Sequence, residues 1–575
     1  MVFINLSHLY TNKIKNRKGI YMRIDLYPEK AQYLTNEIIK LMIEFDTPPT
    51  TEYQADLYIT HLQDMIHKQR VSLTDQLCEI QLPGINTDFG GYGVELLVYQ
   101  NGQLVDCCYT AFDVVSECSK AIRYGFLSDY STDDGLDFRD VSNLRKFHIN
   151  YVQYYDWSYR HDNLVSQKTI YNDMMGRKVD LQTVKNKIKQ CKEYGMKSIG
   201  YGAIYAASRE FYEKNKEWAF YTSTGDPFVF IDIFYIMNIA KNSPWRNHII
   251  EEYAKAIEMV GFDGIHMDTY GFPKSAYSYN KEKLVKLEDE FYSLIEDAKE
   301  RLNRITMDNH LIFNNVGNWP VNTVACAPQD AIYIEVWDPN NRYDHIQQII
   351  KDARRECKDT KPVILAAYLK PFMEETQERS AYAAFFLTAV IVTNGGYHLL
   401  LGEENAVLTQ GYYVDHSFMT ASTSEKMRCY YDFIVQYMEL FYDSELIDVS
   451  LTHMGWDNME YKCLNEGWSV TGEEDRLWIT LREKNNRKLI SLINLSGNDN
   501  FWNQGKNKPP VTENLEMQVL VEKTVKGVYF ISPDKDHGKV QELAYERKKT
   551  DRGWIITFVV PQIEIWSNVW IDLID

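Results

Sequence analysis

Short runs with apolar residues at alternate positions dominate the first part of the chain. Residues 38–45 and 94–99 follow this pattern, and the second run leads into Asn101-Gly102, a hairpin-turn signal, and then another apolar run that ends at Cys108. Strands at this spacing predict an immunoglobulin-like β-sandwich over residues 23–140, preceded by an N-terminal extension over residues 1–22.

The pattern changes in the middle of the chain, where apolar runs alternate with amphipathic helical stretches. Strict alternation of strand and helix, repeated eight times, predicts a (β/α)8 barrel, which we assign to residues 141–465. Hairpin patterns return over residues 466–575 and predict a C-terminal β-sandwich. The expected barrel strands are 147–155, 197–205, 228–234, 264–269, 311–316, 331–337, 363–368 and 387–394.

Charge and hydropathy exclude several classes of function. The 575 residues include 62 Lys and Arg against 81 Asp and Glu, so the formal charge of −19 disfavours binding to nucleic acids and to anionic membranes. The longest largely apolar run, 383–392, is far shorter than the ~20 residues of a membrane-spanning helix. No apolar segment follows the basic residues near the N-terminus, so we expect a cytoplasmic protein, or a secreted one whose signal peptide was removed.

The cysteines indicate neither a disulfide framework nor a zinc site. Nine are scattered along the chain without a Cys-x-x-Cys pair. We expect reduced, mostly buried thiols and no cofactor or resident metal, while a calcium ion in a loop stays open. Aromatic residues make up 14% of the chain, and such rings pack well on the apolar faces of sugars.

Two strands of the predicted barrel end in carboxylates. Catalytic groups of such barrels lie at the carboxyl ends of the strands. In 264–269, alternation directs His266 and Asp268 into the barrel mouth, and in 331–337 it places Glu335 on one face with Tyr333 and Trp337. The two rings are expected to raise the pKa of Glu335, as a general acid requires.

This pair of carboxylates suits cleavage of a glycosidic bond. Asp268 is the expected nucleophile, kept ionised by donors from His266 and Asn314, and Glu335 is the expected acid/base. Polar and aromatic residues at the other strand ends predict a cleft lined for sugar binding. The expected substrate contacts are Tyr155, Asp156, Trp157, Tyr201, Tyr205, His266, Asn314, Trp337, Tyr368 and Asn394.

Three motifs in this order resemble glycoside hydrolase family 66, the dextranases and cycloisomaltooligosaccharide glucanotransferases. They are Tyr155-Asp156-Trp157 with Arg160-His161, the Gly-Phe-Asp-Gly-x-x-x-Asp stretch that ends at Asp268, and Tyr333-x-Glu335-x-Trp337. The order of β-domain, barrel and β-domain agrees, so the resemblance covers nearly the whole chain. It implies a retaining enzyme that acts on α-1,6-linked glucan or isomaltooligosaccharides, with Asp268 as nucleophile and Glu335 as acid/base.

Within this family the cyclising enzymes carry a carbohydrate-binding module inserted in the catalytic region. No β-rich insertion of that size lies between residues 147 and 400, which favours an endo-acting dextranase over a glucanotransferase. An α-amylase-type α-1,4-glucosidase is a weaker alternative, because His266 stands where that family has Arg. A non-catalytic carbohydrate-binding protein and a metal-dependent hydrolase are further alternatives. Chain-length preference and oligomeric state stay open.

Overall fold

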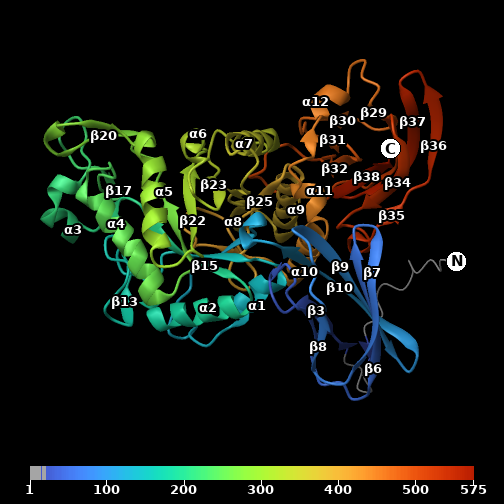
Figure 1. Cartoon of the computed structure of the whole chain (residues 1–575), viewed down its shortest axis with the longest axis horizontal. Coiled ribbons are helices and arrows are strands. Elements are labelled where there is room, and N and C mark those ends of the chain that lie inside the picture. The colour runs from blue at the N-terminus through green and yellow to red at the C-terminus, as the bar shows by residue number, and fades with distance from the viewer. Residues whose placement is uncertain (1–13, 16–20, 575) are drawn as a thin grey trace.

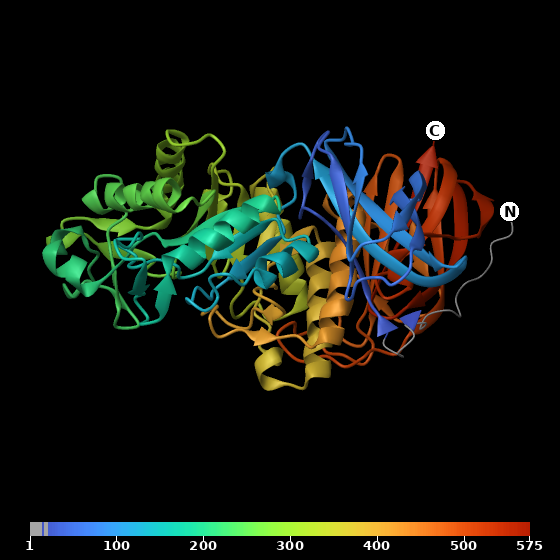
Figure 2. The same cartoon turned by 90° about the horizontal axis from the view of Figure 1, so that it is seen from below.

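The computed structural model describes residues 14–15 and 21–574. Most of the predicted extension 1–22 therefore lies outside the described residues; within it, β1 (Ile14–Lys15) pairs with β2 (Tyr21–Met22). The protein is a mixed α/β chain. The barrel, formed by the middle of the sequence, lies at one end of the molecule, and mainly antiparallel sheets from both ends of the sequence lie together at the other (Figure 1). The two groups of sheets touch, because Tyr109 stacks on His537 with ring centroids 4.3 Å apart (Figure 2).

Two mainly antiparallel sheets form the N-terminal part; one pairing, between β4 and β10, is parallel. Alternate residues of β5, among them Leu41 and Ile43, are buried, as the period of two predicts. Both sheets contribute to one buried cluster that includes Leu57, Leu96 and Phe112. The smaller sheet holds β3 (Ile24–Pro28), β5 (Ile39–Phe45) and β8 (Leu77–Leu82), and the larger holds β4 (Tyr33–Leu34), β10 (Gln103–Val115), β9 (Phe89–Gln100), β6 (Tyr53–His61) and β7 (Asp64–Leu73).

Eight parallel strands form the barrel sheet. Its edges meet where the Phe126 amide donates to the Leu401 carbonyl at 3.0 Å, so the barrel is nearly closed. The strands, in spatial order and also in chain order, are β11 (Tyr124–Leu127), β12 (Tyr151–Tyr154), β15 (Lys197–Ala203), β19 (Gly264–Asp268), β22 (His310–Val316), β23 (Ala331–Glu335), β24 (Val363–Ala366) and β25 (Gly396–His398).

Two of the eight predicted strands are wrong, and two real strands, β11 and β25, were missed. Residues 228–234 form part of a small antiparallel sheet outside the barrel, and residues 387–394 lie mostly in helix α9 (Gln377–Thr393). The missed strand β11 lies inside the range 23–140 that was predicted for the N-terminal domain, and β25 begins only at Gly396. The errors compensate, so the strands that end in Asp268 and Glu335 are still the fourth and the sixth.

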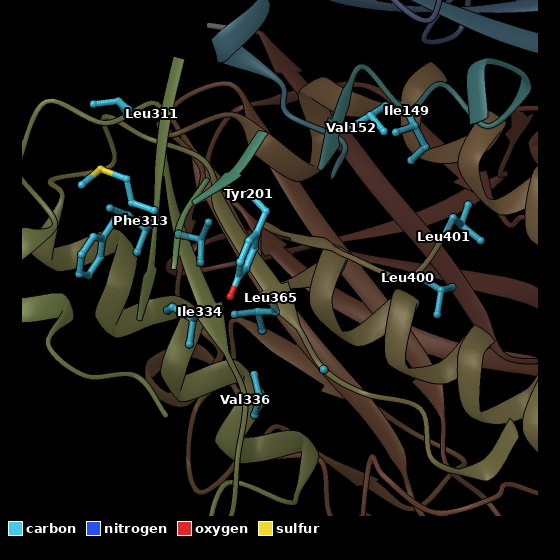
Figure 3. Packing of buried hydrophobic residues seen from close by; sticks show 14 of the residues in the cluster. Ile149, Val152, Tyr201, Leu311, Phe313, Ile334, Val336, Leu365, Leu400 and Leu401 are labelled. Atoms are coloured by element: carbon cyan, nitrogen blue, oxygen red, sulfur yellow. The ribbon is translucent and has the colours of Figure 1, made fainter. Parts of the chain in front are cut away.

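Helices cover the outside of the barrel, one or more between each pair of consecutive strands. Their apolar faces pack on strand residues such as Leu311, Phe313, Ile334 and Leu365 (Figure 3). The helices are α1 (Arg139–Lys146), α2 (Leu181–Glu193), α3 (Arg209–Lys214), α4 (Pro244–Lys255), α5 (Glu288–Asn303), α6 (Val321–Val324), α7 (Tyr343–Glu356), α8 (Pro371–Glu374) and α9, followed by α10 (Ala421–Gln436), α11 (Met438–Tyr442) and α12 (Ser450–His453).

The alternate strand residues fill the interior of the barrel. Tyr151, Ile199, Ile312, Tyr333 and Ile364 belong to a second buried cluster, distinct from the one beneath the helices. Because successive side chains of a strand point to opposite faces, the residues that continue this inner row toward the carboxyl ends open into the barrel mouth. That row positions the polar residues described below.

Two more mainly antiparallel sheets form the C-terminal part, in which the short strand β30 pairs in parallel, and residues of both sheets pack in one buried cluster. Pairing of β28 with β31 brings residues from Ile447 onward into these sheets, upstream of the predicted boundary at 466. One sheet contains β28 (Ile447–Asp448), β30 (Trp468–Ser469), β31 (Leu477–Lys484), β32 (Arg487–Asn494), β38 (Trp566–Ile574), β34 (Thr524–Ile531) and β35 (Gln541–Glu542), and the other β29 (Tyr461–Cys463), β33 (Thr512–Val521), β37 (Gly553–Ile563) and β36 (Tyr545–Thr550).

All nine cysteines are free thiols. Cys108, Cys191 and Cys357 are buried, whereas Cys326 is exposed and the others are partly exposed. The prediction of mostly buried thiols is therefore wrong, because several cysteines lie on sheet edges and helix ends rather than in the core.

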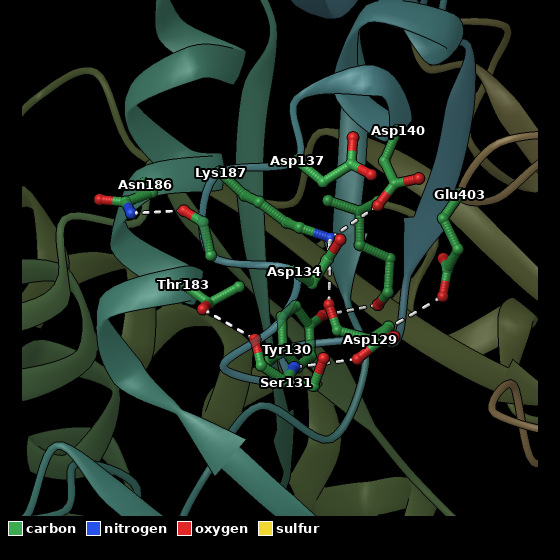
Figure 4. A network of polar contacts seen from close by, with 12 residues as sticks. Asp129, Tyr130, Ser131, Asp134, Asp137, Asp140, Thr183, Asn186, Lys187 and Glu403 are labelled. Atoms are coloured by element: carbon green, nitrogen blue, oxygen red, sulfur yellow. Dashed lines mark hydrogen bonds and ion pairs between the residues drawn. The ribbon is translucent and has the colours of Figure 1, made fainter.

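A buried polar network ties the first barrel strand to the last (Figure 4). The carboxylate of Glu403, which follows β25, accepts hydrogen bonds from the backbone amides of Ser128 and Asp129 at 3.1 Å and from the Ser128 hydroxyl at 2.6 Å. Lys187 of α2 donates to the Asp129 carbonyl and to the carboxylate of Asp140. The network supplements the single backbone bond that joins the edges of the barrel sheet.

Replacing Glu403 by Ala should destabilise the barrel by ~2–4 kcal/mol, because the buried amide and hydroxyl of Ser128 and the part-buried amide of Asp129 lose their acceptor. Urea unfolding followed by tryptophan fluorescence measures this loss. The neighbouring Glu404, whose side chain is 50% exposed, supplies the control, and Glu404→Ala should change stability by less than ~1 kcal/mol. Equal effects of the two substitutions would contradict the role of Glu403.

Candidate active site

Three adjacent strands bring the two predicted catalytic carboxylates together. Asp268 is the last residue of β19 and Glu335 is the last residue of β23, with β22 between them. Register pairs Met267 with Phe313 and Asn314 with Tyr333, so Asp268, Asn314 and Glu335 all lie at the carboxyl end of the sheet. Their neighbours Met267 and Ile334 face the helices, which confirms the predicted alternation.

The amide of Asn314 binds both carboxylates. Its Nδ2 donates to Asp268 Oδ1 at 2.6 Å and to Glu335 Oε2 at 3.2 Å. These two oxygens therefore lie at most about 5.8 Å apart, the sum of the two distances, and this limit is near the ~5–5.5 Å carboxyl separation of retaining glycosidases. One amide thus sets the spacing of the acidic pair.

Each carboxylate also accepts a hydrogen bond from a tyrosine. The hydroxyl of Tyr201, which extends from β15 (Figure 3), donates to Asp268 Oδ2 at 2.6 Å. The hydroxyl of Tyr368, just after β24, donates to Glu335 Oε1. Both tyrosines were predicted to bind substrate, but in this structure their hydroxyls donate hydrogen bonds to Asp268 and Glu335.

Burial makes both carboxylates hard to ionise. It raises the pKa of Asp268 to about 7, the negative charge of Glu335 adds to this rise, and the bonds from Asn314 and Tyr201 act in the opposite direction. Burial also raises the pKa of Glu335, as predicted from its aromatic neighbours. The negative charge of one acid therefore opposes ionisation of the other, whereas the bonds from Asn314 and Tyr201 favour the ionised form of Asp268.

His266 does not donate to Asp268, so that part of the prediction is wrong. Its Nδ1 lies 3.1 Å from the Tyr124 hydroxyl, and its ring meets the edge of Tyr333 in the barrel interior. Burial lowers the pKa of His266 to about 3, so the imidazole is neutral. The alternation that placed it on the inner face was correct, but it sits one layer below the carboxylates.

A cavity of about 600 Å³ opens above the acidic pair. Seven of the ten predicted contacts line it: Tyr155, Asp156, Tyr201, His266, Asn314, Trp337 and Tyr368. Among these, Trp337 is 41% exposed and presents its ring at the mouth. Asp156 adopts a left-handed φ of 48° and lies 3.5 Å from His161.

The remaining three predicted contacts, Trp157, Tyr205 and Asn394, do not line this cavity. Trp157 is fully buried and donates its indole N–H to the Tyr201 carbonyl, because the chain reverses at Asp156 and sends the next side chain into the core. The Tyr205 hydroxyl donates to the Phe272 carbonyl. Asn394 caps the C-terminus of α9 instead of ending a strand.

Several lining residues come from loops that strand patterns do not single out. Tyr413, beyond the last barrel strand, stacks on Tyr155 with ring centroids 4.4 Å apart and bonds the Tyr333 hydroxyl at 2.6 Å. The dipeptide Arg160-His161 in the first motif was the one sequence signal for this group, since His161 lines the cavity. The others include Tyr270 and Tyr412 in loops, whereas Phe230 and Phe234 lie in the short hairpin where a barrel strand had been predicted.

Within residues 14–15 and 21–574, no cluster of three or more His, Cys, Asp or Glu is arranged to hold a metal ion. Over the same residues, no helix combines the length and the hydropathy that crossing a bilayer requires.

A carboxylate pair at the carboxyl end of a nearly closed parallel barrel is an arrangement that glycosidases and transglycosylases use. The chain belongs to glycosyl hydrolase family 66, whose family model matches residues 28–570. A cycloisomaltooligosaccharide glucanotransferase of Niallia circulans is 24% identical over 95% of this chain and 71% of its own length. A dextranase of Streptococcus salivarius is 22% identical over 84% of this chain and 68% of its own.

The likeness extends to the fold. A crystal structure of a Paenibacillus cycloisomaltooligosaccharide glucanotransferase complexed with cycloisomaltoheptaose superposes with a TM-score of 0.86 at 21% identity, covering 95% of this chain and 99% of that one.

Replacing Asn314 by Ala should move the acid limb of the pH–activity profile upward by about one pH unit. In the wild type the Asn314 amide favours the ionised form of Asp268 and so lowers its pKa. Without this donor the pKa rises, and the ionised form that activity needs appears only at higher pH. The profile of kcat/KM from pH 4 to 9 measures the shift. Asn315→Ala is the control, because the Asn315 amide bonds only backbone carbonyls; an equal shift in both variants would contradict the account.

Proposed function

We propose that the protein is a retaining, endo-acting glycoside hydrolase that cleaves α-1,6-glucosidic linkages of dextran or isomaltooligosaccharides. The observation that carries the retaining mechanism is the bridge from Asn314 to both Asp268 and Glu335. The bridge keeps the two carboxylates close together. An inverting enzyme needs room for a water molecule between the sugar and one carboxylate, whereas in a retaining enzyme that carboxylate attacks the sugar directly, and the short spacing favours direct attack.

In this mechanism the singly protonated pair is the reactive form. Asp268 attacks the anomeric carbon while Glu335 protonates the departing glycosidic oxygen, which yields a covalent glycosyl-enzyme. Glu335, now ionised, takes a proton from water, and the resulting attack releases the sugar from Asp268. The Tyr201 and Asn314 donors stabilise the carboxylate charge on Asp268 that exists before attack and returns on release.

Two observations support the choice of substrate and outcome. The relatives are named for dextran and for cyclic isomaltooligosaccharides, both α-1,6-linked glucans. The longest stretch between consecutive barrel strands, from β15 to β19, holds about 60 residues, shorter than the ~100 residues of a typical β-sandwich module. The absence of a module of that size from the described barrel favours hydrolysis over cyclisation.

The second candidate is a cycloisomaltooligosaccharide glucanotransferase. The higher identity and wider coverage of those relatives favour it. In that reaction the 6-hydroxyl at the far end of the same glucan chain replaces water as acceptor. The acidic pair serves both reactions, so only the products separate them.

We also propose that the flanking sheets form an immunoglobulin-like N-terminal β-sandwich and a C-terminal β-sandwich. Each pair of sheets surrounds one buried cluster of its own, which supports this division.

Products from dextran distinguish the two candidates. Purified protein incubated with dextran should release a ladder of linear isomaltooligosaccharides, resolved by thin-layer chromatography. Treatment of the products with an exo-acting glucosidase should convert all of these linear oligosaccharides to glucose. A resistant, cyclic fraction as the main product would favour the glucanotransferase, and release from starch but not from dextran would contradict both.

Losing either carboxylate should nearly abolish turnover. Glu335→Gln should lower kcat on dextran by ~10²–10⁴-fold, and Asp268→Asn by at least as much, because the bond-forming group is gone. Reducing-sugar release measures both. Asp232→Asn changes an exposed carboxylate near the mouth and should leave kcat within twofold.

The role of Glu335 has its own test. In Glu335→Ala, azide should restore part of the activity on an isomaltoside with a nitrophenol leaving group, because that group departs without protonation and azide attacks the glycosyl-enzyme without a base. The product is then a glycosyl azide with the α-configuration. A β-azide, or no azide product from an active variant, would contradict the assignment.

A further inference from the structure

A short hairpin at the cavity carries an unusual turn. Strands β17 (Val229–Phe230) and β18 (Phe234–Ile236) pair with each other. They follow β15 and precede α4 in the sequence, and they lie at the end of the barrel far from the flanking sheets (Figure 1). A third strand, β16 (Ala206–Ala207), completes their sheet. The turn closes where the Ile233 amide donates to the Phe230 carbonyl at 3.1 Å. Its two central residues, Ile231 and Asp232, have φ values of 46° and 62°.

Isoleucine is poorly suited to this position. Turns with positive φ at both central residues strongly prefer Asn-Gly or Asp-Gly, and a β-branched residue in the left-handed region is a genuine outlier. Such backbone strain persists only where surrounding contacts fix the conformation, and it concentrates at functional sites. Here Phe230 stacks on Tyr270 with centroids 4.4 Å apart and Phe234 stacks on His161 at 4.9 Å. These contacts hold both strands of the hairpin against the cavity wall.

The strained side chain faces the cavity rather than the core. Ile231 lines the cavity and is 50% exposed, whereas Ile233, two residues later, packs against the main core cluster. Met175 and Trp337 are also cavity-lining and are 39% and 41% exposed. The three come from loops after β12, β15 and β23, so exposed apolar groups surround the mouth on several sides.

Apolar groups in such a place match one feature of a glucan. The C–H faces of pyranose rings are apolar, and rings or branched aliphatic groups cover them while the hydroxyls stay in water. Ile231 has no hydrogen-bonding atom and can contribute only this kind of contact. Ile231 lines the same cavity as the acidic pair but is more exposed than either carboxylate, so we expect the contact to lie toward the mouth, outside the reacting linkage.

We propose that Ile231 is a specificity-determining residue that packs on glucose units beyond the cleaved linkage, held there by a turn conformation that its own side chain disfavours. The proposal rests on the proposed function, because it takes the ligand to be an α-glucan. It predicts that substitutions of Ile231 change stability and substrate affinity in opposite directions.

The test compares Ile231→Asn with two other variants. Asn tolerates the left-handed region, so Ile231→Asn should raise the melting temperature by about 1–2 °C. It should also raise KM for dextran and long isomaltooligosaccharides about 5–10-fold. kcat should stay within twofold, and activity on a short nitrophenyl isomaltoside should not change. Ile231→Val keeps both the strain and the apolar surface, and should match the wild type.

Lys281→Gly is the matched control. Lys281 is exposed, has a φ of 59° beside Asn280 at 54°, and lies outside the cavity lining. Relieving strain there should raise the melting temperature without changing KM. Equal KM values for Ile231→Asn and Lys281→Gly would overturn the proposal, and so would a lower melting temperature of Ile231→Asn. If the wild type acts on no α-1,6-glucan, the proposed function fails first and this inference fails with it.

Discussion

The close approach of two partly buried carboxylates is the constraint on which the rest of the site depends. Asp268 and Glu335 would repel each other strongly if both were ionised, and burial makes the charged forms costlier still. Asn314 offsets part of this cost by donating to both, and Tyr201 and Tyr368 each donate to one. The barrel provides the geometry, since neighbouring parallel strands in fixed register deliver these groups to the same edge. Beneath them, the barrel interior is filled by packed side chains that include Tyr333 and the neutral His266. This packing restricts movement of the two carboxylates.

The sequence predicted the parts that repeat with a fixed period. Alternation along β19 and β23 identified Asp268 and Glu335, and three motifs identified the family before any fold was known. Short or fully buried segments were harder. Four-residue β11 carries too few residues to show a period, and the apolar run at 387–394 reads equally well as a buried strand or as the buried helix α9 that it mostly is.

For the site, the sequence predicted which strand residues lie at the barrel mouth, but not their hydrogen-bond partners or the loop residues beside them. Tyr201 and Tyr368 were correctly placed at the mouth, but no sequence pattern tells that a tyrosine hydroxyl is bound to a carboxylate rather than free for substrate. Trp157 follows two cavity residues in a motif, yet the left-handed turn at Asp156 sends it into the core. Tyr413 and the hairpin at Ile231 lie on loops, whose tertiary position depends on contacts far apart in sequence.

Retention of configuration is the central claim, because it links the spacing of the acidic pair to the chemistry. Proton NMR of the first products released from an α-1,6-linked oligosaccharide, recorded before mutarotation, tests it directly. The account predicts that the new reducing end appears first as the α-anomer and then equilibrates. Initial appearance of the β-anomer would mean that water attacks in a single step, and it would contradict the nucleophilic role of Asp268.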